Sequence, residues 1–175
     1  MFARISETVL YPPYRDMYDY RRITPELLPS AKTLQVASFG HNTTYADVLW
    51  VGLVQSIGDN IGNNKYLDFS HLILKNITSL SPYFTYAYQT DLLFTPLVYA
   101  DSQSGITLDD RNKIERAIEH GKEGMKIFCD QDKIQTISSL PYGKELWKRD
   151  DLRNPCLSGM VPYYIGFHYA NDFEE

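Results

Sequence analysis

The sequence lacks any apolar run close to the length that a membrane-spanning helix requires. Hydrophobic residues make up 43% of the chain, but they are interrupted by polar ones throughout, whereas a transmembrane helix needs about 20 consecutive apolar residues. Residues 1–7 also lack the basic and then apolar segments of a signal peptide. We therefore expect a soluble chain without a membrane span, and the sequence does not indicate a compartment.

Basic residues are few, and this argues against a nucleic-acid-binding protein. The chain has 17 Lys and Arg against 22 Asp and Glu, a net charge of −5 and a sequence pI of about 5.3. Nucleic-acid binding depends on clustered Lys and Arg that neutralise phosphates. The clearest basic pair, Arg21-Arg22, is surrounded by acidic and neutral residues. We expect no nucleic-acid partner.

Cysteine is almost absent. The chain has two, Cys129 and Cys156, and neither belongs to a CxxC sequence, so no zinc or redox motif is present. A disulfide between them is one alternative. We expect instead two buried or half-buried thiols.

The histidines do not form a metal-binding motif. None of the four residues, His41, His71, His120 and His168, has another at the i, i+4 spacing, and HExxH is absent. We expect His71 and His120 on helix exteriors and His168 packed among aromatics. His41 and Asp47 could meet across a helix start, either as a metal or catalytic pair or in ordinary capping, and we expect capping.

Other catalytic motifs are also missing. Asp109 and Asp110 are neighbours that point in different directions on a helix, so we interpret them as acids that favour its N-terminus rather than as glycosidase carboxylates. Ser158-Gly159 lacks the flanking glycine of a hydrolase elbow, and no phosphate-binding glycine loop is present. The sequence predicts a non-enzyme with no catalytic, cofactor-binding or metal-binding residues.

Apolar spacing predicts an all-α domain over residues 24–175, preceded by an extended arm at residues 1–23. Strand signals are few, and the helical stripes are regular. On one helix Val48, Val51 and Val54 add apolar surface outside the main stripe, which indicates that this helix is covered on more than one face. The expected helices span about 30–38, 44–57, 65–80, 82–96, 107–128 and 161–173.

Helix starts and close contacts can also be assigned from the sequence. Thr44 begins a capping-box pattern, Pro82 stands at a first helical position, and Pro96 ends or kinks the helix that follows. Gly121 and Gly124 would let another helix approach closely, which offsets their cost in a helix of up to about 1 kcal/mol each. Residues 129–157 are broken by Pro and Gly, with a turn or two of helix at 144–149.

The order of residues resembles tetratricopeptide repeats, which are antiparallel helix pairs of about 34 residues. The matching positions are Trp50, Leu53 and Ile57 on a first helix and Ser70, Leu74 and Pro82 on and after a second. The turn between the helices is about four residues longer than in the standard repeat, and Val54 replaces the usual Gly. Tyr88 and Ala117 mark a poorer second copy, in which Gly121 replaces the bulky residue. Residues 161–164 resemble the start of a further, incomplete repeat.

A closer resemblance covers about residues 28–173. In order along the chain, it rests on 28–30, 36–41, 46–50 (Ala-Asp-Val-Leu-Trp), 81–88 (Ser-Pro-Tyr-Phe-Thr-Tyr-Ala-Tyr) and 162–167 (Pro-Tyr-Tyr-Ile-Gly-Phe). These strings are similar to those of a group of bacterial tetratricopeptide-like proteins of unassigned function. Members often carry an N-terminal membrane anchor, and we expect none in this chain. The resemblance implies a short α-solenoid with an interaction or assembly role and no catalytic residues.

In tetratricopeptide folds the first helix of each pair lines a concave groove. By position, Gln55, Asp59, Tyr86, Gln89 and Leu93 would face it, and aromatic anchors beside amides suit the capture of a peptide or protein. Tyr86 and Leu93 could equally contact a neighbouring helix. The main alternative functions are a helical-hairpin enzyme acting on glycans, which needs close buried carboxylates, and a structural subunit covered by sister subunits.

Overall fold

The computed structural model describes residues 29–60, 67–99, 108–140 and 148–171, and these residues form helices, turns and one isolated β-bridge. The all-α class is therefore confirmed for the described residues. The expected arm, 1–23, lies outside them. The elements are α3 (Ala31–Ala37), α4 (Asn42–Asn60), α5 (Leu67–Leu80), α6 (Thr85–Tyr99), α7 (Leu108–Phe128), α8 (Gln131–Ser139), a 3-10 helix (Asp150–Leu152) and α9 (Met160–Asn171).

The helices that carry strong local signals begin and end close to the predicted residues. Ser30 is the N-cap of α3, and its hydroxyl accepts a hydrogen bond from the Thr33 amide at 3.3 Å, as capping residues do. The turn after α3 uses positive φ angles of 49° at Phe39 and 86° at Gly40. Glycine adopts this conformation at no steric cost.

Two predicted boundaries are wrong. Thr44 is not a cap, because α4 already begins at Asn42 and the Tyr45 amide donates to the His41 carbonyl at 3.0 Å. Pro82 lies in a turn in which the Phe84 amide donates a hydrogen bond to the Ser81 carbonyl at 3.0 Å, and α6 begins only at Thr85. This helix also continues past position 96 to Tyr99.

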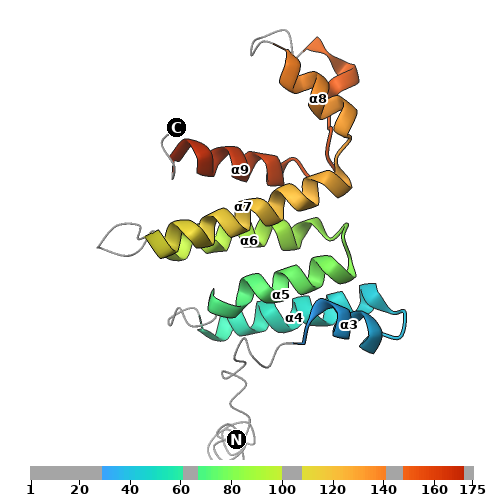
Figure 1. Ribbon diagram of the computed structural model, residues 1–175, viewed down its shortest axis with the longest axis vertical. Helices are drawn as coiled ribbons and strands as arrows, with labels where there is room; N and C mark the ends of the chain where they lie inside the picture. The colour runs from blue at the N-terminus through green and yellow to red at the C-terminus, as the bar shows by residue number, and fades with distance from the viewer. Residues whose placement is uncertain (1–28, 61–66, 100–107, 141–147, 172–175) are drawn as a thin grey trace, which may run out of the picture.

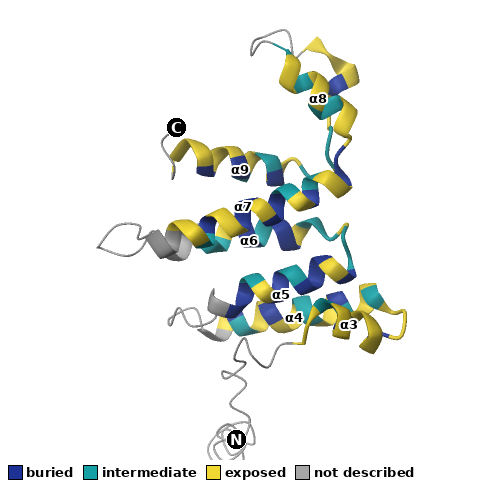
Figure 2. Ribbon diagram, in the orientation of Figure 1, coloured by how far each residue is buried: buried dark blue, intermediate teal, exposed yellow. Residues whose placement is uncertain are grey.

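The five longest helices lie one above another along the long axis of the molecule, in the order α4, α5, α6, α7 and α9 (Figure 1). Each packs against the next, and α9 also contacts α6. One buried cluster joins α3, α4, α5 and the start of α6, and a second joins α6, α7 and α9. Figure 2 shows that buried residues gather where these helices meet.

The small residues of α7 allow the close approach that their spacing predicts. A Cβ added at Gly121 would lie 3.0 Å from Leu92 Cδ1 and 3.1 Å from Ile165 Cδ1, so both α6 and α9 approach the backbone here. One turn later, a Cβ at Gly124 would lie 2.7 Å from Tyr88 Cε1. Burial of apolar surface on these neighbours offsets the poor helix propensity of glycine.

Residues 129–157 contain an α-helix that the sequence did not indicate. Helix α8 begins after Asp130, whose carboxylate accepts from the Lys133 amide at 3.1 Å. None of the residues in α8 is buried, which explains why no apolar stripe marks it. The helix projects beyond the rest of the chain in Figure 1. The turn of helix expected at 144–149 falls mainly outside the described residues.

The prediction of two separate thiols is wrong, because Cys129 and Cys156 form a disulfide. Two backbone hydrogen bonds accompany it, from the Asp130 amide to the Pro155 carbonyl at 2.7 Å and from the Leu157 amide to the Phe128 carbonyl at 3.2 Å. Together they close the loop that carries α8 where α7 ends and the approach to α9 begins. Sequence spacing alone does not reveal this pairing, since it depends on how α9 folds back onto α7.

Candidate functional site

The predicted partner-binding residues lie on two helices. Tyr86, Gln89 and Leu93 follow the i, i+3, i+7 spacing on one face of α6. Tyr86 is 66% exposed and Leu93 is 36% exposed, while Gln89 is half-buried. Gln55 is exposed on α4; Asp59 belongs to the same helix, but its side chain lies outside the described residues.

One of these residues is engaged within the chain. The Gln89 amide donates to the Ser158 hydroxyl at 2.7 Å, and this hydroxyl also accepts from the Met160 amide at 3.2 Å. Gln89 therefore connects α6 to the beginning of α9. A partner that used the Gln89 amide nitrogen would have to compete with this contact.

Helix α4 exposes three valines on the side away from its core stripe. Val48, Val51 and Val54 are 62%, 54% and 49% exposed, and Gln55 lies beside them. We expected this surface to be covered on a second side. Within the described residues it is not covered.

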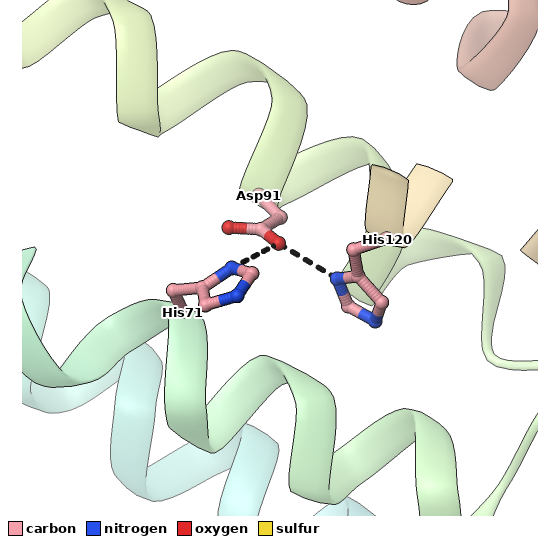
Figure 3. Close-up of side chains that lie close together, drawn as sticks. All are labelled: His71, Asp91 and His120. Carbon is pink, nitrogen blue, oxygen red and sulfur yellow. Dashed lines mark hydrogen bonds and ion pairs between the residues drawn. The ribbon is translucent and has the colours of Figure 1, made fainter. Parts of the chain in front are cut away.

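A second cluster lies inside the molecule and joins three helices. His71 of α5 and His120 of α7 both point toward Asp91 of α6 (Figure 3). Each imidazole Nδ1 lies 2.7 Å from the same carboxylate oxygen, Oδ2. The Asp91 and His120 side chains are 0% and 2% exposed, whereas His71 is 27% exposed at the edge of the cluster.

The Asp91 carboxylate is buried but carries a charge. Burial alone raises the pKa of Asp91, but hydrogen bonds from His120 and His71, with their positive potential, outweigh it and hold the pKa below its usual value. A carboxylate only accepts hydrogen bonds, so each Nδ1 carries a proton in this arrangement. The network therefore concentrates charge between α5, α6 and α7.

Hydroxyl groups hold one outer atom of Asp91 and one of His120. The Thr95 hydroxyl donates to the other oxygen of Asp91, Oδ1, at 3.2 Å. The Thr78 hydroxyl lies 2.8 Å from Nε2 of His120 and 3.0 Å from the Lys75 carbonyl. Among the described residues, no buried side-chain polar atom lacks a hydrogen-bond partner.

Aromatic rings fix the orientation of the imidazoles. The Tyr88 ring centroid is 4.7 Å from that of His120, and the two imidazoles meet edge to face at 5.7 Å. The Tyr88 hydroxyl donates to the Pro82 carbonyl at 3.2 Å. Burial is the main cause that raises the pKa of Tyr88. The His120 side of the cluster is thus enclosed by a packed ring as well as by hydrogen bonds.

The prediction that His71 and His120 lie on helix exteriors is wrong, and the reason is the same for both residues. Each of these helices packs against more than one neighbour, so a single apolar stripe underestimates its buried surface. His120 follows Ala117 by three residues and precedes Gly124 by four, and both are buried. Similarly, Asp91 follows the buried Ala87 by four. The spacing from these buried small residues could have indicated that His120 and Asp91 are buried too.

The other two histidines differ from each other. His168 is buried, as expected, and its Nε2 donates to the Leu92 carbonyl at 2.8 Å. His41 and Asp47 are both exposed. The proposed metal or catalytic pair at this position gains no support from burial.

No known protein family, curated protein or solved structure matches this chain. The geometry of its own side chains therefore has to indicate its function. That geometry offers an exposed surface on α4 and α6 and an enclosed polar cluster between α5, α6 and α7.

Proposed function

We propose that the chain is a non-catalytic scaffold that binds a protein or peptide on the exposed faces of α4 and α6. In this proposal, α4 with α5 and α6 with α7 are antiparallel, tetratricopeptide-like pairs stacked as a short α-solenoid, and α9 begins a third pair. The observation that carries it is the apolar character of the exposed α4 face, because uncovered apolar surface marks interaction sites.

The pattern of helix contacts supports the repeat arrangement. Each of α4, α5 and α6 packs on the helix that follows it, and α6 also contacts α9, as the first helices of adjacent pairs would. Ser70 and Ala117, at the small-residue positions, are 6% and 1% exposed, and Leu74 is 1% exposed. Small residues there let the two helices of a pair approach closely.

Helix α7 presents a different surface from α4, α6 and α9. Helix α7 exposes mainly charged side chains, whereas α4 exposes valines, α6 exposes Tyr86 and Leu93, and α9 exposes tyrosines and a phenylalanine. Charged faces are typical of solvated surface, and aromatic and aliphatic ones of binding surface. The exposed charged residues of α7 are Arg111, Glu115, Arg116, Glu119, Glu123 and Lys126.

The glycan-processing alternative has less support. Glycosidases use two carboxyl groups that face one bond. Among the described residues, Asp91 is the one buried carboxylate, and two imidazoles and a threonine hydroxyl occupy its oxygens. A carboxylate in this arrangement is not free to act on a sugar.

Selection from a random peptide library tests the proposal. Peptides that bind the purified chain are measured by fluorescence anisotropy against the wild type, Val51→Asp and Tyr86→Asp. Both positions are more than half exposed, so we expect the fold to tolerate an aspartate there. In a peptide interface, however, the buried charge should cost well over the roughly 1.4 kcal/mol that corresponds to a tenfold loss of affinity. We expect at least a tenfold weakening.

Arg116→Asp on the charged face of α7 is the matched control, because it introduces the same side chain at an exposed position. We expect it to leave peptide affinity unchanged. Circular dichroism confirms folding of all three variants. The proposal fails if no peptide binds saturably, or if the α7 variant loses as much affinity as the variants on α4 and α6.

A further inference from the structure

Three potential metal ligands converge from three helices at one point. The ligand atoms are Nδ1 of His71, Oδ2 of Asp91 and Nδ1 of His120, and all lie within 4.8 Å of one another. They come from α5, α6 and α7 and are separated by 20 and 29 residues in sequence. Only the folded chain can therefore assemble this set.

We propose that His71, Asp91 and His120 bind a divalent transition-metal ion, with Zn²⁺ as the best fit. Two imidazole nitrogens and one carboxylate oxygen are ligands that zinc accepts in proteins, and three protein ligands leave a fourth position for another group. The harder cations Mg²⁺ and Ca²⁺ prefer oxygen ligands throughout. The site lies between helices and is independent of the partner-binding surface proposed for α4 and α6.

One ion can be held at these distances once the three ligand atoms adjust around it. Zinc lies about 2.0–2.2 Å from nitrogen and oxygen ligands, so tetrahedral ligands stand about 3.3 Å apart. The two Nδ1 to Oδ2 distances are 2.7 Å. Metal binding would replace both hydrogen-bonding protons and lengthen each Nδ1–Oδ2 separation by about 0.6 Å. The two Nδ1 atoms, which lie within 4.8 Å of each other, would move to a similar separation of about 3.3 Å. The 27% exposure of His71 places the most adjustable ligand on the solvent side.

Two of the atoms that would not touch the metal are already held by hydrogen bonds. Histidine ligands usually engage their second ring nitrogen in a hydrogen bond that fixes the ring. Here Thr78 occupies Nε2 of His120 at 2.8 Å, and Thr95 occupies Oδ1 of Asp91 at 3.2 Å. Both hydroxyls leave Nδ1 and Oδ2 directed at the common point. A ligand site and its supporting contacts are thus present together.

The competing explanation is a polar network that connects three helices and binds nothing. Isothermal titration with ZnCl₂ distinguishes the two, using tag-free protein without reductant so that Cys129 and Cys156 stay in their disulfide. We expect one Zn²⁺ per chain. Co²⁺ in place of zinc should give a visible absorption band typical of low-coordinate nitrogen and oxygen ligation.

Three variants assign the site. His71→Ala removes the most exposed ligand and should weaken zinc binding more than 100-fold, since even loss of a supporting contact costs about 10–100-fold. Thr78→Val removes such a contact and should cost about 10–100-fold. His41→Ala removes an exposed histidine elsewhere and should change nothing.

Thermal unfolding followed by circular dichroism verifies that each variant folds. The proposal is overturned if folded wild-type protein does not bind Zn²⁺ saturably, or if the His71 variant binds as tightly as the wild type. In either case the cluster is a hydrogen-bonded network alone.

Discussion

Replacing Gly124 with alanine should destabilise the protein, although alanine is the better helix former. Gly124 lies inside α7, where the exchange alone would stabilise the helix by about 1 kcal/mol. The added Cβ, however, would lie 2.7 Å from Tyr88 Cε1 and 2.8 Å from Phe128 Cε1. Neither ring can retreat easily, because Tyr88 and Phe128 are 2% and 6% exposed and pack on each other at 5.5 Å.

The magnitude follows from the two opposing terms. Overpacking a well-packed core costs about 1–3 kcal/mol, and contacts this short require shifts of more than half an ångström, which places the cost in the upper part of that range. Subtracting the propensity gain of about 1 kcal/mol leaves a net loss of about 1–2 kcal/mol. For a chain of this size, the melting temperature should fall by roughly 2–8 °C.

Urea unfolding followed by circular dichroism measures this difference, and Gly52→Ala provides the matched control. Gly52 also lies inside a helix, α4, but a Cβ there meets nothing within 4 Å. We expect this variant to gain up to about 1 kcal/mol. If Gly124→Ala were as stabilising as Gly52→Ala, the packing of Tyr88 and Phe128 against α7 described above would be incorrect.

Two further predictions concern the disulfide and the buried carboxylate. Reduction, or the double variant Cys129→Ser/Cys156→Ser, should lower stability by roughly 3–4 kcal/mol, since the crosslinked residues are 27 apart in sequence; urea unfolding with and without reductant checks this, and equal midpoints would contradict it. Because the pKa of Asp91 is lowered in the folded state, its carboxylate stabilises the metal-free fold at pH values above the unfolded-state pKa of about 3.9. This stabilisation is lost as the pH falls through the lower folded-state pKa. Between pH 5 and pH 3, the wild type should therefore lose more stability than Asp91→Asn in urea unfolding, and parallel losses would contradict this assignment.

The parts of the fold that could be predicted are those with a local cause. Ser30 caps α3 through its own hydroxyl, and the apolar spacing of α5 and α7 depends on residues a few positions apart. The small residues of α7 also predicted a close helix contact, and Leu92 and Ile165 make this contact at Gly121. Boundaries set by competing turns, as at Thr85, were missed because Ser81-Pro82 suits both a turn and a helix start.

The spacing of His120 and Asp91 from buried small residues could have indicated their burial, but the meeting of the three side chains could not be predicted because it depends on contacts between helices. His71, Asp91 and His120 are each polar residues in an amphipathic segment, where the simplest interpretation places them in solvent. Their burial follows from α5, α6 and α7 contacting one another on more than one side. Cys129 and Cys156 illustrate the same limit, since their pairing depends on where α9 lies.

Stability alone is a weak reason for the His71–Asp91–His120 cluster. Replacing a buried, hydrogen-bonded charge network with well-packed apolar residues is often neutral or stabilising by about 1–4 kcal/mol, because the desolvation of the charges is avoided. The neighbouring core already uses apolar residues such as Leu74 and Ile118, so the helices can meet without charges. By this argument the network adds little to net stability, yet hydroxyls hold Nε2 of His120 and Oδ1 of Asp91, and the His120 ring packs on Tyr88. Such an arrangement is better explained by a ligand that needs these nitrogens and this carboxylate in fixed positions. The zinc titration is therefore also a test of why α5, α6 and α7 meet around a charged residue.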